Sequence, residues 1–267
     1  MLGSDDAVLV VGGGAAGHAC VTTYREAGGD RPVVLASADD RPPYFRPFVT
    51  KEHLAGSVDA AELALAPPDW YRTNDVEVVL ECDVRALDLG ARLAASTAGP
   101  IRWGRCVLAT GSDPAPLPVA GTDERVVTIR SASDAERLVA ALDGPVVVVG
   151  SGFVGCEAAA SLRARGVDVT MVSEEPRPQA DRLGDDVGRL VEGWLRDGGT
   201  TLLGGRQVEA IDRQGDALVV TVAGGAVVEA SLVVVVVVEH EAAPVVGAWR
   251  RRTRRGSSRG ATGGSGR

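Results

Sequence analysis

The sequence predicts an α/β fold made of two similar units, and three observations lead to this prediction. An apolar run at residues 8–11 precedes a cluster of glycines, and a second apolar run at 146–149 precedes another. Each cluster opens a segment of helical character, and a further apolar run and an acidic residue follow. Short apolar runs that alternate with helical segments are typical of parallel sheets covered by helices.

The first glycine cluster has the spacing G-x-G-x-x-G, which is typical of a Rossmann-like dinucleotide-binding domain. Gly12 permits the tight turn that leaves the strand, and Gly14 lets a diphosphate approach the backbone. Gly17 lets the following helix pack closely on the sheet.

The helix after this turn is expected to hold phosphates. It begins at Ala15 and Ala16, where free N–H groups and the positive end of the helix dipole face an anion. A strand is expected next over 32–36, and Asp39 follows it, 22 residues after Gly17. An acidic residue at this place accepts hydrogen bonds from ribose hydroxyls.

The whole signal recurs in the second half of the chain. The residues expected at this second turn are Gly150, Gly152, Phe153, Val154 and Gly155. An amphipathic helix follows and ends at Gly166, and a strand over 167–172 precedes Glu174. One glycine cluster alone could be a flexible turn without a ligand, but two complete copies favour two dinucleotide sites.

The remaining segments fit the same two units. A helix is expected over 185–197, with its apolar residues at 187, 190, 191, 194 and 195 facing the core. Strands are expected over 208–211, 217–222 and 226–237, and the proline-rich residues 114–118 are expected to link the units.

Composition excludes several classes of function. The chain has 267 residues and a net charge of -8. Seven arginines and no acidic residue lie from Arg250 onward, so the rest of the chain is more acidic than the net charge suggests. Because an acidic surface repels phosphates, nucleic acid is not an expected partner. The longest apolar run, 232–238, is too short to span a membrane, and the acidic N-terminus is unlike an export signal, so a cytoplasmic protein is expected. The four cysteines form no C-x-x-C pair, so neither a metal site nor a redox dithiol is expected.

Four motifs in order carry a resemblance to a known family. They are the first glycine cluster, RPPYFRPFVTKEHLAG at 41–56, VLATGSDPAPLPVAG at 107–121, and the second glycine cluster. Together, over about residues 7–235, the chain resembles flavoprotein reductases with two dinucleotide-binding domains, of the ferredoxin, rubredoxin and nitrite reductase type. The resemblance implies FAD at the first turn, NADH at the second, and an electron acceptor that is a ferredoxin- or rubredoxin-like protein or a small molecule.

The resemblance also implies roles for particular residues. Arg46 and Lys51 would lie beside the flavin, and Glu157 would pair with Lys51 at the contact between flavin and nicotinamide. The remaining implied cofactor contacts are Val84, Ala109, Thr110 and Gly111. From the residues alone, Val84 and the segment that begins at Ala109 could equally be ordinary strand residues, and Glu157 an exposed glutamate in the first turn of a helix.

Two departures from the family pattern affect these expectations. Ser173 stands where the ribose-binding acid usually lies, and Glu174 and Glu175 come after it. An acid that contacts the ribose selects NADH and repels the 2′-phosphate of NADPH, so NADH is favoured. Beyond about Val235 the family's GD segment and C-terminal interface domain do not appear.

This second departure predicts a truncated or frame-shifted reductase. The expected organisation is an incomplete FAD-binding domain at 1–122, an NAD(P)H-binding domain at 123–238 and a disordered basic tail at 239–267. Three alternatives are a nucleotide-binding remnant without activity, a chain that needs a second subunit, and a tail that binds RNA or acidic lipid.

Overall fold

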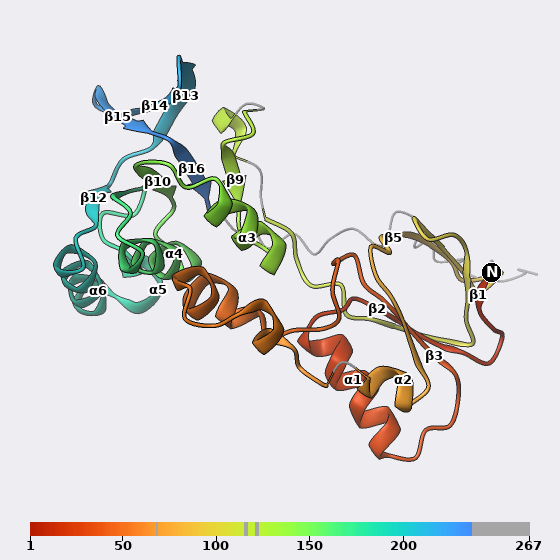
Figure 1. Ribbon diagram of the computed structural model, residues 1–267. Coiled ribbons are helices and arrows are strands. Elements are labelled where there is room, and N and C mark those ends of the chain that lie inside the picture. The colour runs from red at the N-terminus through yellow and green to blue at the C-terminus, as the bar shows by residue number, and fades with distance from the viewer. Residues whose placement is uncertain (68, 115–116, 121–122, 237–267) are drawn as a thin grey trace, which may run out of the picture.

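The computed structural model describes residues 1–67, 69–114, 117–120 and 123–236, and it contains two lobes, each built on a parallel sheet (Figure 1). The predicted α/β class with two Rossmann-like units is confirmed. The linker expected at 114–118 lies partly outside the described residues. The tail expected at 239–267 lies wholly outside them.

The first lobe is a four-stranded parallel sheet in the order β4-β3-β2-β8. Its elements are β2 (Val8–Val11), α1 (Ala15–Glu26), β3 (Val33–Ala36), α2 (Trp70–Thr73), β4 (Val76–Val79) and β8 (Arg105–Leu108). All residues of β2 and β3 are buried, which explains their continuous apolar sequence. The central position of β2 places its carboxyl end, and thus the first glycine turn, in the middle of the sheet.

A second, smaller sheet covers this one. Its order is β1-β7-β6-β5, formed by β1 (Leu2–Gly3), β5 (Val84–Asp88), β6 (Leu93–Ser96) and β7 (Ile101–Arg102). Leu9, Val11 and Val34 of the parallel sheet and Val84, Ala94 and Ile101 of the small sheet belong to one buried cluster. This cluster holds the two sheets face to face.

The second lobe repeats the plan with a five-stranded parallel sheet in the order β12-β11-β10-β16-β9. Its elements are β9 (Val126–Thr128), α3 (Ala132–Ala140), β10 (Val146–Val149), α4 (Phe153–Ala164), β11 (Val169–Ser173), α5 (Ala180–Leu183), α6 (Asp185–Asp197), β12 (Thr201–Gly204) and β16 (Leu232–Val235). A three-stranded antiparallel sheet of β13 (Val208–Gln214), β14 (Ala217–Val222) and β15 (Ala226–Ala230) packs on it.

A helical segment of the first half of the chain joins the core of the second lobe. It contains η1 (Arg46–Phe48), η2 (Val49–His53) and η3 (Ala60–Leu63), and in Figure 1 it extends from the first lobe to α4. Its buried side chains Tyr44, Val49, Leu54 and Leu63 belong to the same cluster as residues of α3, α4 and β10. A further short helix, η4 (Pro118–Ala120), precedes β9.

Two expectations from the sequence were wrong in part. Helix α6 has the expected bounds, but Val187, Leu190 and Trp194 are exposed, with Trp194 68 % accessible, whereas Leu195 is 6 % accessible. Helices α4 and α5 and strand β12 pack on one face of α6, and an apolar arc of five positions is wider than that face. The strand expected over 226–237 is two strands, because the chain changes sheets at Ser231.

Among the described residues, no helix is long and apolar enough to cross a membrane.

Candidate functional site

The first glycine turn has the geometry that its sequence predicts. Gly12 has φ +118°, and a Cβ there would collide with the carbonyl oxygen of Ala109. Gly17 is buried, and a Cβ on it would collide with the carbonyl oxygen of Gly12. These two glycines therefore serve the fold, and they bring the ATGS segment that begins at Ala109 against the turn.

Gly14 differs from its two neighbours because it faces open space. The atom nearest to an added Cβ is Arg46 Nε, 3.9 Å away. Gly14 is the N-cap of α1, no side chain caps it, and the first turn of the helix has no acidic residue. Ala15 and Ala16 are exposed in that first turn. Free N–H groups thus face an open space, which is the arrangement that binds a diphosphate.

Asp39 and Arg46 lie together beside this turn. Arg46 Nη2 forms an ion pair with Asp39 Oδ2, and Arg46 Nη1 donates to the carbonyl oxygen of Arg130 at 2.9 Å. The guanidinium of Arg46 also lies over the ring of Tyr44, 5.0 Å from its centroid. Two predicted cofactor residues that are seven positions apart are therefore held in one fixed arrangement.

Two further residues near the turn were missed by the sequence analysis. Ser37 is buried, lies where a Cβ on Gly13 would be, and accepts a hydrogen bond from the Asp39 N–H at 3.3 Å. Arg130 Nη2 lies 2.9 Å from the Cβ position of Gly111. Burial lowers the pKa of Arg130, and the nearby cation of Arg46 lowers it further. No motif surrounds Arg130, so only the folded chain reveals it.

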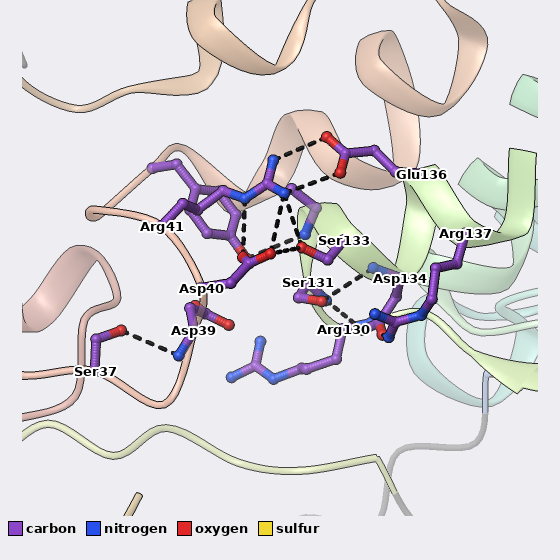
Figure 2. Close-up of polar contacts among 12 residues, drawn as sticks. Ser37, Asp39, Asp40, Arg41, Arg130, Ser131, Ser133, Asp134, Glu136 and Arg137 are labelled. Carbon is purple, nitrogen blue, oxygen red and sulfur yellow. Dashed lines mark hydrogen bonds and ion pairs between the residues drawn. The ribbon is translucent and has the colours of Figure 1, made fainter. Parts of the chain in front are cut away.

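A polar network joins the loop at 39–41 to helix α3 (Figure 2). Arg41 donates to both carboxylate oxygens of Glu136 at 2.9 Å and to Ser133 Oγ at 2.8 Å. Ser133 donates to Asp40 at 2.6 Å. The hydrogen bonds from Arg41 lower the pKa values of both Glu136 and Asp40. This network fixes the loop that carries Asp39 against the second lobe.

The second glycine turn repeats the first. Gly150 has φ +108°, and its N–H donates to Val172 O at 2.8 Å, as Gly12 does to Ala36 O at 2.8 Å. A Cβ on Gly155 would collide with the carbonyl oxygen of Gly150. Arg182 Nη1 lies 3.1 Å from the Cβ position of Gly152, as Arg46 Nε lies 3.9 Å from that of Gly14 in the first turn. A cation therefore stands over this turn, a feature that the sequence analysis missed because α5 carries no recognisable motif.

The second turn begins helix α4, whose first residues Phe153 and Val154 follow the N-cap Gly152. Phe153 is 54 % exposed although it is a large apolar side chain. No side chain caps this helix and its first turn has no acid, so its N–H groups are free as well.

Of the two glutamates after β11, only Glu175 reaches the turn. Its Oε2 accepts from Ser151 Oγ at 2.9 Å and from the Gln179 N–H at 3.1 Å. Gln179 is buried and donates to Ser151 O at 2.9 Å. Glu174 is exposed and makes no hydrogen bond with a described residue. The chain turns back after the buried Ser173, and this turn brings the later glutamate to the glycines.

The predicted pair of Lys51 and Glu157 forms. Lys51 Nζ lies 2.8 Å from Glu157 Oε1, and Thr50 Oγ1 donates to Glu157 Oε2 at 2.6 Å. Lys51 Nζ also donates to Pro47 O at 3.1 Å. The alternative of an exposed first-turn glutamate is therefore wrong, because Glu157 is partly buried and lies just beyond the first turn of α4. The pair joins the helical segment of the first half of the chain to the helix that starts at the second glycine turn.

Val84 lies in β5, is buried, and packs in the core of the first lobe. Two residues before it, the Cys82 N–H donates to Ser37 O at 2.8 Å, so this strand begins next to the loop that carries Asp39. The four cysteines are free thiols. Within the described part of the chain, no group of three or more His, Cys, Asp and Glu side chains is placed to hold a metal ion.

The sequence profile of one family, described as pyridine nucleotide-disulphide oxidoreductase, matches residues 6–241. The chain belongs to this family. The family match runs through both glycine turns and through Lys51 and Glu157, which the fold brings together.

Individual relatives agree with this assignment. The chain is 38 % identical over 189 residues to human apoptosis-inducing factor 3, an alignment of 69 % of this chain and 30 % of that protein. It is 33 % identical over 182 residues to rhodocoxin reductase of Rhodococcus erythropolis, which covers 66 % of this chain and 42 % of that protein. The chain therefore spans less than half the length of either relative.

A solved structure resembles most of this chain. Putidaredoxin reductase, in its covalent complex with putidaredoxin, superposes with a TM-score of 0.81 at 27 % identity, covering 88 % of this chain and 59 % of that one.

Proposed function

We propose that this chain binds FAD at the first glycine turn and NADH at the second, and that it brings the two together for hydride transfer from NADH to the flavin. The observation that carries the proposal is the Lys51–Glu157 ion pair of 2.8 Å, which joins the segment beside the first site to helix α4 of the second. FAD, when bound, supplies the redox chemistry, because it accepts a hydride and passes electrons on singly.

The first turn fits the FAD diphosphate, since a Cβ at Gly14 would lie in open space above the free N–H groups of α1. Arg46 and Lys51 would supply cations beside the ring of a bound flavin, and Arg130, which lies beside Gly111, would supply a third. Cations at this place favour electron density that arrives on the ring. Val84 and the segment Ala109–Gly111 complete the proposed contacts.

The second turn fits the diphosphate of NADH in the same way, with the free N–H groups at Phe153, Val154 and Gly155 and the cation of Arg182. For the ribose we propose Glu175 in place of the expected Glu174. Glu175 Oε2 accepts two hydrogen bonds at the turn, and its Oε1 makes none with a described residue. A carboxylate there repels the 2′-phosphate of NADPH, so NADH is the proposed donor.

The proposed electron acceptor is a ferredoxin- or rubredoxin-type protein. Rhodocoxin reductase and the complex of putidaredoxin reductase with putidaredoxin support this class of acceptor. The four cysteines lie at positions 20, 82, 106 and 156, so no two of them form a redox pair after the first turn. Electrons would therefore pass from the flavin directly to the acceptor.

Anaerobic titration of the purified full chain tests the proposal. The chain is incubated with FAD, separated from free FAD, and titrated with NADH while the visible flavin absorption is followed. We expect a yellow protein that NADH bleaches, and a Lys51→Met variant that retains FAD but bleaches more slowly. A colourless chain that still binds NADH would instead support an inactive nucleotide-binding remnant. A colour that appears only with a co-purified chain would support a required second subunit.

A further inference from the structure

Three polar side chains, two on helix α4 and one at its C-cap, contact the segment that carries Lys51. Glu157, Ser161 and Arg165 are spaced four residues apart, so they lie in line along the helix. Ser161 Oγ donates to the carbonyl oxygens of Thr50 at 2.8 Å and Lys51 at 3.2 Å. Arg165 Nε donates to the carbonyl oxygen of Leu54.

The segment held in this way has an interrupted helical backbone. The helical backbone over Val49–His53 is kinked at Lys51, whose angles of φ -113° and ψ -105° are not helical. A kink leaves carbonyl groups without partners in the regular helical hydrogen-bond ladder, so that other donors can meet them. Here the carbonyls of Thr50 and Lys51 face α4, where the hydroxyl of Ser161 meets them.

The hydrogen bonds of this contact are buried, whereas the side chain of Lys51 is partly exposed. Thr50 and Ser161 are 8 % and 7 % accessible, so their hydrogen bonds are shielded from water. The side chain of Lys51 is 41 % accessible. A long, exposed lysine side chain has many rotamers, and it takes one place only when its backbone and its ion partner are both fixed. Ser161 fixes the backbone of Lys51, and Thr50 orients Glu157.

We propose that Ser161 is a positioning residue that sets Lys51 in contact with Glu157. This inference rests on the proposed function, because it assigns to α4 a second task in the same site. Helix α4 begins at the turn that would hold NADH, and four residues after Glu157 it holds the backbone of the lysine that would lie beside the flavin. Binding at the second turn and the place of Lys51 are therefore linked through one rigid helix.

The sequence provides a direct probe of this place, because Lys51 is the only lysine among the 28 lysines and arginines. Labelling with ¹³C-lysine therefore gives one lysine side-chain signal by NMR. In the parent chain, without cofactors, we expect two inequivalent ε-protons at shifts distinct from free lysine. In Ser161→Ala the two should merge toward the free-lysine position. An unchanged signal in a folded Ser161→Ala chain would overturn the inference.

Thr200→Val is the matched control for this measurement. Thr200 is also buried, but its hydroxyl has no hydrogen-bond partner among the described residues. Deleting that hydroxyl should therefore leave the Lys51 signal as it is in the parent. A shift of the same size in Thr200→Val would mean that the signal reports any loss of a buried hydroxyl, and it would also overturn the inference.

A double-mutant cycle separates positioning from general destabilisation. With FAD bound, Ser161→Ala should slow flavin reduction by NADH about tenfold, the effect of losing one buried hydrogen bond, with little change in KM. In a Lys51→Met background the same substitution should have no further effect, because Ser161 acts through Lys51. Equal slowing in both backgrounds would refute the positioning role.

Two provisions keep the test decisive. If Ser161→Ala does not fold, Ser161→Cys replaces it, since a thiol fills the same space and donates only weakly. The NMR arm needs neither FAD nor NADH. A parent chain that binds no flavin would therefore refute the proposed function, while the NMR arm would still decide the place of Lys51.

Discussion

Gly14→Val tests whether Gly14 is needed for ligand binding and not for folding, unlike the other glycines of the first turn. Gly14 has φ -84°, an angle that any residue adopts, and an added Cβ would lie 3.9 Å from its nearest neighbour, Arg46 Nε. The chain without cofactor should therefore accept valine at a cost of about 1 kcal/mol, because valine is a poor N-cap residue.

FAD binding should suffer far more than stability. The valine side chain would occupy the space above the free N–H groups of α1, so the diphosphate would lose one or two charge-assisted hydrogen bonds of about 1.5–3 kcal/mol each. A loss of about 3 kcal/mol corresponds to a dissociation constant about 100-fold higher. Gly12→Ala should instead lower the free energy of unfolding by about 2–4 kcal/mol, because Gly12 has φ +118° and its Cβ would meet Ala109 O.

Two measurements on the same variants check this prediction. Thermal unfolding followed by circular dichroism gives stability without cofactor, and quenching of FAD fluorescence gives the dissociation constant. Gly193→Ala on α6 is the control, since no atom lies within 4 Å of its Cβ position. It should stabilise the helix by up to about 1 kcal/mol and leave FAD affinity unchanged. A Gly14→Val chain that binds FAD as tightly as the parent would show that no diphosphate lies over Gly14.

Three further predictions follow from contacts in the second lobe and between the lobes. Glu175→Gln should raise KM for NADH about tenfold, because a charge-assisted hydrogen bond is lost. Glu174→Gln should leave KM nearly unchanged. Equal changes of KM in the two variants, measured by steady-state kinetics, would contradict this prediction. Glu136 has a lowered pKa beside Arg41, so its contribution to stability is present above its unfolded pKa and is lost as pH falls through the folded value. Arg41→Met should therefore lower the free energy of unfolding at neutral pH by less than about 1 kcal/mol. In urea titrations, the stability of the variant should fall less steeply than that of the parent below about pH 4. An equally steep fall in both chains would contradict this prediction. Trp194→Ala should change the free energy of unfolding by less than about 0.5 kcal/mol, since Trp194 is 68 % exposed, and a loss of several kcal/mol would mean that this face is covered in solution.

Local sequence was a reliable guide where backbone chemistry decides. The glycine spacing predicted both turns, because only glycine fits where a Cβ would meet a carbonyl, as at Gly17 and Gly155. Helix α6 was predicted with its correct bounds because glycines and a 3.6-residue period delimit it. Which of its apolar residues are buried was not predicted, since the face that α4, α5 and β12 cover is decided by packing and not by local sequence.

Site residues that lie outside the recognised motifs were not predicted from the sequence. Arg130 and Arg182 approach Gly111 and Gly152 from elements without any signature. Glu175 replaces Glu174 at the second turn because the chain folds back after Ser173. Each of these residues reaches its turn through a contact between segments that are far apart in the sequence, or through a change in chain direction. Neither feature can be recognised in a short stretch of sequence.

The sequence by itself determined the two strand–glycine–helix units, their order and the residue types available for chemistry. These follow from steric rules and hydrophobic periods that act over a few residues. The tertiary structure alone decided that residues 44–63 pack into the second lobe, that Ser161 meets the backbone of Lys51, and that Arg41 joins α3. Those contacts bridge about one hundred residues of chain, and only the packing of complete elements brings such partners together.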